Sequence, residues 1–362
     1  MSNMKKISIL ITSYNLENYI DTAIQSVVKQ DMPCDWELLV GDDGSIDSTV
    51  QHIQEWVGKY PQNITLYQWS KAENHSMNGF RSADNRARLL EKATGDYIIF
   101  LDGDDNWLGT DKLRKQFDLL ENPEYADCSC CGHNIYKETG NEETSKAILS
   151  TKIPKRKFTK YQYYRGAVYV HTNTILFRSC CKELMLMEPY RHYLNDLFIT
   201  FCILQYGKMV YLPDILAQYN ITGTGLWTGA KKVFSKFRNV HLYDLEVNID
   251  PRFEKTIFDA LCGNMAIILK EYSTEDIPTI TPLVKGLDAS IFKCTTTLFK
   301  LDNLTDEEIK YKMQLKKRIL PSRIKSKIYR EYDKMLNFCL RFQSLMRQDT
   351  REMSPYRSRR KQ

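Results

Sequence analysis

The sequence predicts an α/β protein in which a mostly parallel sheet is covered by helices on both faces, followed by a helical C-terminal extension. Apolar runs of strand length alternate with segments of helical periodicity over residues 6–101, an order typical of parallel sheets. After about Leu226 the pattern becomes mainly helical. The chain has 362 residues, 43% of them hydrophobic, so it can bury the core of one large domain plus an appendage and is not disordered as a whole.

The first predicted strand, Lys6–Ser13, is a nearly continuous apolar run rich in isoleucine, as expected for a strand buried on both faces. Leu16–Gln30 follows with apolar residues spaced by three and four, which predicts a helix. Five further segments continue the alternation: a strand over Trp36–Gly41, a helix over Thr49–Tyr60, a strand over Ile64–Gln68, a helix over Ala83–Ala93 and a strand over Asp96–Leu101. Gly95 is well placed to end the third helix, because glycine is a common helix terminator.

The C-terminal part is predicted to be helical and basic. In Ser322–Met346 the apolar residues are separated by three or four positions and form one stripe of a helix, whereas Tyr356–Gln362 is expected to be a disordered, basic end. We therefore divide the chain into an α/β domain over residues 1–225, a helical region over 226–350 and a basic tail over 351–362.

The charge is unevenly distributed along the chain. From Thr305 to Gln362 there are 17 Lys and Arg against 7 Asp and Glu, a net charge of +10, while the remainder has 34 against 38, a net charge of −4. Three interpretations of the basic helix stay open: packing on the α/β domain, contact with an anionic membrane surface, or binding of a partner protein. Nucleic acid is not an expected partner, because no known binding motif accompanies the charge.

No apolar stretch approaches the roughly 20 residues that span a bilayer, and the N-terminal apolar run lacks a cleavage site. We therefore expect a cytoplasmic protein, at the inner face of the cell membrane if the basic helix binds lipid. The ten cysteines are expected to be reduced. Cys128, Cys130, Cys131 and His133 lack the paired spacing of a zinc site. Cys128 and Cys130 should share one face of a strand, so buried small hydrophobic residues are the favoured interpretation.

Polar and acidic residues follow three of the predicted strands. Ser13-Tyr14-Asn15 follows the first, Asp42-Asp43 the second and Asp102-Gly103-Asp104-Asp105 the fourth. Ligands of open parallel sheets bind beyond the carboxyl ends of the strands, so these residues are expected to face one another across a cleft. Carboxylates gathered there repel one another unless a cation or a hydrogen-bonding ligand lies between them.

The cluster at 102–105 predicts a site for a divalent metal and a nucleotide. Mg²⁺ and Mn²⁺ prefer carboxylate oxygens and leave positions open for phosphate oxygens, and a second carboxylate can accept a ribose hydroxyl. Asp43 can accept the N3–H of a uracil or thymine ring, and Tyr14 can stack on the base. The alternatives are an Asx-type turn or helix cap at Asp42-Asp43, and a Tyr14 ring packed on the rim of the sheet.

Three segments closely resemble the family 2 glycosyltransferases: Ile7–Asn15, Asp42–Thr49 and Ala93–Asp105. The resemblance extends over roughly residues 5–220. It implies the GT-A fold, a nucleotide-sugar donor, with a UDP-sugar favoured, and a divalent metal, Mn²⁺ or Mg²⁺. It also implies a nucleotide-sugar half over about residues 1–110 and an acceptor half over about 111–225. The residues assigned in this way to the nucleotide are Thr12, Tyr14, Asp42, Asp43, Arg86, Asp102 and Asp104, and those assigned to the metal are Asp104 and Asp105.

The chain departs from the family pattern in two places. Asn85-Arg86-Ala87 stands where the family often has Ala-Arg-Asn, so Arg86 is the nearest match, and Arg81 is another candidate for a diphosphate contact. Asn195-Asp196 stands where the family usually has Glu-Asp, and Asp196 falls on the position of the catalytic base.

The predicted acceptor half supplies three further candidates. His171 and Thr172 lie in a segment where the family lines its acceptor site, although a structural histidine is equally compatible with the sequence. Trp227 follows two glycines in a segment that can be a mobile loop over the donor, where the indole would stack on a sugar. A hinge between domains is the alternative for that segment.

Together these residues predict an inverting, metal-dependent transferase. It would move a hexosyl or N-acetylhexosaminyl group from a nucleotide-sugar to a glycan or lipid-linked acceptor in surface-polysaccharide synthesis. Asp196 would take the proton of the acceptor hydroxyl while the diphosphate leaves from the opposite face of the sugar. A nucleotidyltransferase is the first alternative, but it should carry a glycine-rich, basic loop after the first strand, which Ser13–Glu17 lacks. An inactive sugar-nucleotide-binding protein is the second, and the intact set of aspartates argues against it.

Overall fold

The structure is a computed structural model that describes residues 5–69, 81–148, 157–164, 170–188, 190–222, 242, 245, 246 and 249–253. The chain divides into two compact units, residues 1–229 and residues 230–362. The first unit holds the sheet and the described candidate site residues. The predicted loop with Trp227, the apolar stripe of Ser322–Met346 and the basic tail all lie outside the described residues. Within the part of the chain that is described, no helix combines the length and apolar character needed to cross a membrane.

Residues 6–102 form the parallel half of the sheet. The elements in chain order are β1 (Lys6–Ser13), α1 (Ile20–Val28), β2 (Asp35–Asp42), α2 (Thr49–Lys59), β3 (Ile64–Gln68), α3 (Arg81–Lys92) and β4 (Tyr97–Asp102). The strands lie in the order β3-β2-β1-β4, and each pair is parallel. The alternation predicted from the sequence is therefore confirmed for this half, with element ends shifted by a few residues.

The largest shift is at the start of α1, which begins at Ile20 and not at Leu16. Asn15 has a positive φ of 53°, a conformation that asparagine adopts more readily than most residues. The backbone N–H of Leu16 donates to Oγ1 of Thr49, the first residue of α2, at 2.6 Å. The segment after β1 is thus a turn tied to the neighbouring loop, and the apolar periodicity begins before the helix does.

Residues 106–220 complete the sheet with strands of mixed direction. The elements are β5 (Asn106–Trp107), α4 (Lys112–Glu121), β6 (Cys128–Glu138), β7 (Lys146–Ile148), β8 (Lys157–Phe158), α5 (Lys160–Tyr164), β9 (Leu176–Arg178), α6 (Lys182–Leu186), α7 (Asp196–Ile203) and β10 (Lys208–Asn220). Short 3-10 turns occupy residues 123–125, 172–174, 179–181 and 190–193. The sheet continues in the order β4-β9-β6-β10-β5, with β7 beside β6 and β8 beside β10. β9 is antiparallel to β4 and β6, whereas β6 and β10 are parallel.

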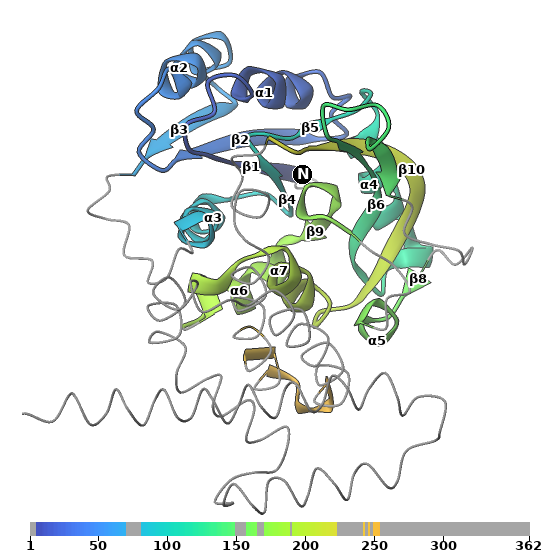
Figure 1. Ribbon diagram of the computed structural model, residues 1–362. Helices are drawn as coiled ribbons and strands as arrows, with labels where there is room; N and C mark the ends of the chain where they lie inside the picture. The colour runs from blue at the N-terminus through green and yellow to red at the C-terminus, as the bar shows by residue number, and fades with distance from the viewer. Residues whose placement is uncertain are drawn as a thin grey trace, which may run out of the picture. The chain divides into compact units, whose positions relative to one another are not determined.

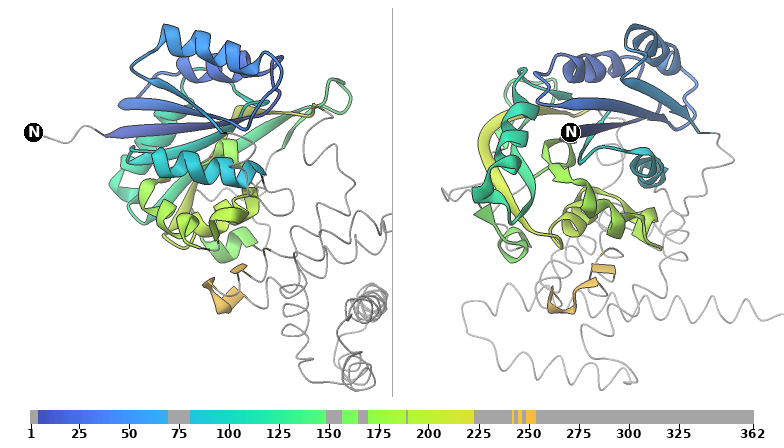
Figure 2. Two further views of the ribbon diagram at one scale, coloured as in Figure 1. Left: turned by 90° about the vertical axis from the view of Figure 1, so that its left-hand side faces the viewer. Right: turned by 180° about the vertical axis from the view of Figure 1, so that it is seen from behind.

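Helices cover both faces of the sheet, as predicted. Figure 1 shows α1 and α2 on one face of the parallel strands and α3, α6 and α7 on the other, and Figure 2 shows the same layers from two further directions. Ile7, Ile9 and Ile11 of β1 are fully buried and belong to one core cluster with apolar residues of α1, α2 and β2. Because β1 is buried on both faces and paired on both edges, its carboxyl end is held in the middle of the sheet.

The cysteines of β6 are buried, as the favoured interpretation predicted, but the expectation about their faces was wrong. Cys128, Cys130 and Cys131 are each at most 2% exposed. The pairing with β10 shifts register between Lys208 and Met209, which pair with Cys128 and Cys130. This bulge interrupts the alternation of side chains between the two faces of the sheet. Cys128 therefore belongs to the same core cluster as Cys131, and Cys130 lies outside that cluster.

Candidate active site

The carboxyl ends of β2, β1 and β4 lie side by side, as the sequence predicted. Thr12 of β1 pairs with Gly41 on one side and with Asp102 on the other, and Ser13 pairs with Asp42. Gly103 follows directly, and a Cβ at this position would lie 2.9 Å from the Thr12 carbonyl oxygen. The close approach of these backbones therefore requires a residue without a side chain in the middle of the acidic cluster.

Asp42 stabilises the loop after β2. Its carboxylate accepts hydrogen bonds from the backbone N–H of Gly44 at 3.1 Å and of Ser45 at 2.9 Å. The hydroxyls of Ser13, at 3.1 Å, and Ser45, at 2.5 Å, also donate to it. This arrangement matches the Asx-type turn that was the alternative for Asp42, so a role in nucleotide binding would require the loop to rearrange.

Asp43 and Tyr14, the residues predicted to contact the base, lie at the ends of the neighbouring strands β2 and β1. Asp43 is 5% exposed, and its N–H donates to the carbonyl of Ser13 at 3.0 Å. Tyr14 is 40% exposed, which makes it one of the few large exposed aromatic residues in the described part of the chain. The structure thus brings the two residues to the same rim of the sheet, and their contact with a base stays a prediction.

Asp102 is bound by Arg86. The Arg86 guanidinium is almost fully buried, and its Nη2 donates to both Asp102 oxygens at 2.8 Å. The Thr12 hydroxyl donates to Asp102 Oδ1 at 2.9 Å. Burial by itself would raise the pKa of Asp102, but the charge and hydrogen bonds of Arg86, with smaller contributions from His171 and Thr12, hold it below its usual 3.8. Asp102 is therefore held as a carboxylate.

Arg86 also reaches the second half of the site. Its Nη1 donates to the carbonyl of Leu194 at 3.0 Å and lies 3.6 Å from Oδ1 of Asp196. Its guanidinium thus joins two carboxylates that are far apart in sequence. These protein partners occupy both terminal nitrogens of the guanidinium. A contact between Arg86 and the donor diphosphate stays a prediction. The side chain of Arg81, the other diphosphate candidate, lies outside the described part of the structure.

Asp104 and Asp105 are adjacent in sequence but differ in environment. Asp104 is partly exposed, and burial together with the negative charge of Asp102 raises its pKa to about 6. Asp105 is 1% exposed, and its Oδ2 accepts from Asn173 Nδ2 at 2.9 Å while its Oδ1 accepts from the backbone N–H of Asn220 at 2.9 Å. Burial, followed by the charges of Asp104 and Asp102, raises the pKa of Asp105 as well.

Asp196 is the first residue of α7. Asn195 caps the helix by accepting the N–H of Phe198 at 3.0 Å, which fixes Asp196 in the first turn. The Thr172 hydroxyl donates to Asp196 Oδ1 at 3.0 Å, and His171 Nε2 lies 3.4 Å from Oδ2. With 30% of its side chain exposed, Asp196 keeps access to solvent while its neighbours restrict its orientation.

Of the two predicted metal ligands, Asp104 is partly exposed and Asp105 is buried, so Asp104 is the better placed to hold a divalent metal, and both assignments stay predictions. Among the described residues, no three His, Cys, Asp or Glu side chains are grouped to hold a metal ion. A hard cation in such a site is held by one or two carboxylates and by phosphate oxygens of the substrate. Asp102 is already paired with Arg86, and Asp105 is engaged on both oxygens. The raised pKa of Asp104 marks a carboxylate next to like charge, which a bound cation would stabilise.

Six of the predicted site residues therefore belong to one connected network. Those joined by hydrogen bonds or ion pairs are Thr12, Asp102, Arg86, Asp196, Thr172 and His171, with Asp104 and Asp105 shortly after Asp102 in the chain. Sequence reasoning did not identify Asn173 and Asn220 as partners of Asp105, nor Tyr219, whose ring centroid lies 4.8 Å from that of His171. The only local feature of the sequence that could have indicated a role for Asn220 was its polar side chain at the end of the long strand β10.

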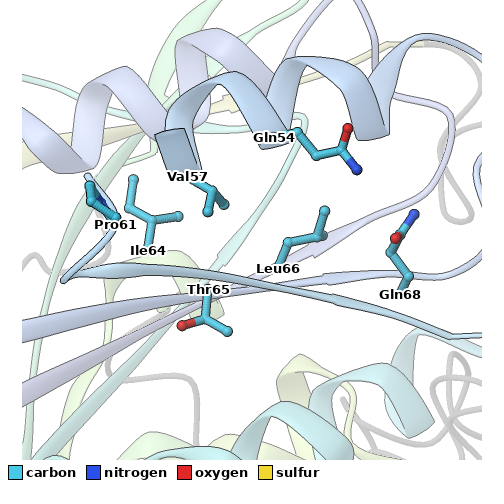
Figure 3. Close-up of a pocket in the computed structure, with 7 residues that line it drawn as sticks. All are labelled: Gln54, Val57, Pro61, Ile64, Thr65, Leu66 and Gln68. Carbon is cyan, nitrogen blue, oxygen red and sulfur yellow. The ribbon is translucent and has the colours of Figure 1, made fainter. Parts of the chain in front are cut away.

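A second feature lies elsewhere in the domain. Between α2 and the edge strand β3 there is a pocket, shown in Figure 3, whose lining is apolar or carries amide and hydroxyl groups. Its lining residues are Gln54, Val57, Pro61, Ile64, Thr65, Leu66 and Gln68. This lining contains no titratable group and is separate from the carboxylates at the strand ends, so the pocket is not a candidate for acid–base or metal chemistry.

Residues 8–185 match the sequence pattern of Glycosyl transferase family 2. An uncharacterised glycosyltransferase of Haemophilus influenzae is 30% identical over 241 residues, which cover 62% of this chain and 87% of that protein. The chain belongs to glycosyl transferase family 2. It is also 27% identical over 246 residues to the putative teichuronic acid biosynthesis glycosyltransferase TuaG of Bacillus subtilis, a match that covers 66% of this chain and 90% of that protein.

Solved structures show the fold of this family member. The crystal structure of S. aureus TarS 1–349 in complex with UDP-GlcNAc matches with a TM-score of 0.61 at 15% identity, covering 92% of this chain and 88% of that chain. The mannosyltransferase PcManGT of Pyrobaculum calidifontis, solved with GDP-Man and Mn²⁺, matches with a TM-score of 0.50 at 17% identity, covering 82% of this chain and 84% of that chain. The prediction of the GT-A fold is confirmed.

Proposed function

We propose that this family 2 protein transfers a sugar from a nucleotide-sugar, most simply a UDP-sugar, to a hydroxyl of a surface-polysaccharide or lipid-linked acceptor. The observation that carries the proposal is the contact network around Arg86. Arg86 contacts both the candidate base Asp196 and Asp102 at the end of β4, which supports a single site that contains both. The TuaG similarity and the UDP-GlcNAc bound to TarS support a polysaccharide acceptor and a UDP-sugar donor.

On the donor side, Tyr14 would stack on the base and Asp43 would accept its N–H, while Asp102 and Asp104 would hold the ribose and the metal. The divalent metal would supply positive charge for the diphosphate that leaves. Asp104 is the residue that would hold it, because it is partly exposed next to the carboxylate of Asp102, and the Mn²⁺ in the PcManGT structure supports the use of a divalent metal. Arg86 would keep Asp102 ionised and oriented while the donor binds.

On the acceptor side, Asp196 would act as the general base. The acceptor oxygen forms a bond to the anomeric carbon as the bond between that carbon and the diphosphate oxygen breaks, and the hydroxyl proton passes to the Asp196 carboxylate. A single displacement of this kind inverts the anomeric centre. The Thr172 hydroxyl, bound to Oδ1 of Asp196, would leave Oδ2 as the oxygen that receives the proton.

The location and partners of the chain follow from this proposal. An acceptor carried on a membrane lipid would place the enzyme at the inner face of the cell membrane, and the basic segment beyond Thr305 would then contact anionic headgroups. This part of the proposal is independent of the catalytic residues and is tested separately, by sedimentation of the full chain with vesicles that contain or lack anionic lipid.

The central test is donor turnover with purified full-length protein. A panel of UDP-, GDP- and dTDP-sugars is incubated with Mn²⁺, Mg²⁺ or EDTA, and the released nucleoside diphosphate is measured. One donor is expected to be turned over in a metal-dependent manner, and Asp104→Asn and Asp196→Asn should abolish release. Asp214→Asn, which removes a surface ion pair with Lys115, serves as the control and should retain it. EDTA-resistant release, or release that survives Asp196→Asn, would contradict the proposal.

A further inference from the structure

Asp105 is anchored differently from the other carboxylates of the site. Its two oxygens accept from two amide groups of the second half of the domain: the Asn173 side chain and the Asn220 backbone. Both donors are contributed by segments that follow Asp105 by many positions in the chain. The Arg86 guanidinium, in contrast, binds Asp102 and lies beside Asp196. We call Asp105, Asn173 and Asn220 the amide clamp.

The clamp is part of a larger set of bonds around the 3-10 turn at residues 172–174. The indole Nε1 of Trp107 donates to the Asn173 carbonyl at 3.2 Å, and Gln116 Nε2 donates to the Thr174 carbonyl at 2.9 Å. The two donors belong to β5 and α4, the elements that follow Asp105 in the chain. The turn is thus bound through its side chain and its backbone to residues 105–116.

The same turn holds the candidate base. Thr172 precedes Asn173 and donates its hydroxyl to Asp196. On the other side, the Asn220 side chain donates to the Asp104 carbonyl at 2.7 Å and to Asn106 Oδ1 at 3.2 Å, so the end of β10 fixes the backbone of the metal-binding candidate. These hydrogen bonds, together with the peptide bond between Thr172 and Asn173, therefore connect Asp104 through the clamp to Asp196.

We propose that Asp105 is a positioning residue and not a metal ligand: through the amide clamp it sets the location of Asp104 relative to Asp196. The proposal rests on the proposed function for the roles of those two residues. Each Asp105 oxygen keeps a lone pair, but the carboxylate is 1% exposed and faces the two amide donors. Binding a metal beside the substrate would require Asp105 to turn away from these donors, which would weaken two buried hydrogen bonds. Asp104 is partly exposed and can bind a metal without breaking these bonds.

The distinction is tested by replacing Asp105 with asparagine and with alanine. In Asp105→Asn, the oxygen of the introduced amide still accepts from Asn220, and the Asn173 amide can rotate to present its oxygen, which has no hydrogen-bond partner among the described residues. The clamp is then kept although the charge is lost. Asp105→Ala loses both bonds. A metal ligand would behave differently, because a neutral amide is a poor substitute for a carboxylate in binding Mn²⁺.

The first readout is the affinity for Mn²⁺ in the presence of UDP, measured from free Mn²⁺ by electron paramagnetic resonance. Asp105→Asn should change this affinity by less than about threefold, whereas Asp104→Asn should lower it by about tenfold or more. An equally large loss in Asp105→Asn would overturn the proposal.

The second readout does not depend on any donor. The Asn220 N–H donates to Asp105, so its hydrogen exchange should accelerate by about tenfold or more in Asp105→Ala and stay near that of the unchanged protein in Asp105→Asn. Unchanged exchange in Asp105→Ala would show that the clamp does not hold β10. If Mn²⁺ and UDP fail to bind the unchanged protein, the proposed function is in doubt, but this readout still decides on the clamp.

The third readout separates positioning from general stability. Asn173→Ala removes one side-chain donor and should lower kcat by about 10- to 100-fold while the donor KM and the Mn²⁺ affinity change by less than about threefold. Asn173→Asp places two carboxylates together and should be worse, and the double variant Asp105→Asn/Asn173→Asp restores one amide–carboxylate bond and should recover activity. A double variant no better than Asn173→Asp would count against the clamp.

Discussion

The two halves of the sheet differ in how they deliver residues to the site. In the parallel half, β1 pairs with β2 and β4 without a register shift, and each strand carries its polar residues to the same edge. In the mixed half, the pairing of β6 with β10 shifts register at three places, and β9 runs against its neighbours. In the regularly paired parallel half, the position of a residue along its strand predicts where it lies at the edge of the sheet. In the mixed half, the position of a residue depends on contacts between segments that are far apart in the chain.

The halves also contribute different chemistry. The parallel half and the loop after β4 provide the clustered carboxylates, and Arg86 is the cation that offsets them. The mixed half provides neutral donors, from Thr172 and Asn173, and the isolated carboxylate of Asp196. A site at the junction of the halves therefore depends on residues that cross it, and substitutions in one half or at the junction should differ in their effects.

The largest effect is expected where the mixed half provides the base. Asp196→Asn should lower kcat by about 10²–10⁴-fold, because the amide cannot accept the acceptor proton, while the donor KM is nearly unchanged. Thr172→Val keeps the base and removes one hydrogen bond to it, so its loss should be about tenfold. Initial rates with saturating donor give both values. If the rate of Asp196→Asn were within tenfold of that of the unchanged enzyme, the catalytic base would have to be another residue.

The next effect is expected at the junction. Arg86→Met leaves two partly exposed carboxylates without their buried cation and should reduce the free energy of unfolding by about 2–4 kcal/mol, measured by urea denaturation. The stability of Arg86→Lys should lie between those of Arg86→Met and the unchanged protein, since lysine keeps the charge but cannot donate to Asp102 and to the Leu194 carbonyl from two nitrogens. Arg114 pairs with Asp31 on the surface through Nε and Nη2, and Arg114→Met should leave the urea midpoint almost unchanged. Equal losses at both arginines would contradict the distinction.

A smaller effect is expected inside the parallel half. A Cβ at Gly41 would lie 2.1 Å from Asn85 Oδ1, and Asn85 is held by bonds to the Gly41 carbonyl and to the Trp69 indole. Gly41→Ala should therefore cost about 1–3 kcal/mol of unfolding free energy. Gly58, inside α2, has no atom within 4 Å of such a Cβ, and Gly58→Ala should stabilise by about 0.5–1 kcal/mol. Thermal unfolding of the two variants should thus show shifts of opposite sign.

The smallest effect is expected from the lysine buried in the mixed half. Lys112 is fully buried, lies 4.3 Å from the Trp107 ring centroid and donates to Gln116 Oε1 at 2.8 Å. Burial lowers its pKa well below the usual 10.5. At pH values between that lowered pKa and 10.5, the unfolded chain therefore binds more protons at Lys112 than the folded protein does. The contribution of Lys112 to the free energy of unfolding consequently rises with pH across this range.

Lys112→Met should remove this dependence. Near neutral pH the net change should stay within about 1 kcal/mol, because the relief of burying the amine is offset by the Gln116 oxygen that loses its donor. The stability difference between the unchanged protein and the variant, measured in urea at about pH 7 and about pH 9, should shift in favour of the unchanged protein at the higher pH. Lys115→Met on the same helix is the control, because the raised pKa of Lys115 keeps it charged in both states over this range. A difference that does not change with pH would mean that Lys112 is charged in the folded protein.

Much of the parallel half could be predicted from the sequence. Strands β1 and β4 are apolar runs bounded by turn signals, and burial on both faces of the sheet makes such runs almost unambiguous. The start of α1 could not be predicted to the residue, since the bond from Leu16 to Thr49 that shapes the preceding turn joins two separate segments. The face of Cys128 in β6 was predicted wrongly, because a bulge depends on the partner strand and leaves no period in the sequence.

By itself the sequence determined the order of strands and helices up to residue 102, the acidic edge of the sheet, and the candidacy of Asp196 through its resemblance to a family. Only the tertiary structure decided which of those carboxylates face one another. It paired Asp102 with Arg86, turned Asp105 inward onto Asn173 and Asn220, and left Asp104 partly exposed. The physical reason is that alternation and helical period are local properties of the chain, whereas the partner of a buried charge is whatever group the fold brings within hydrogen-bond distance.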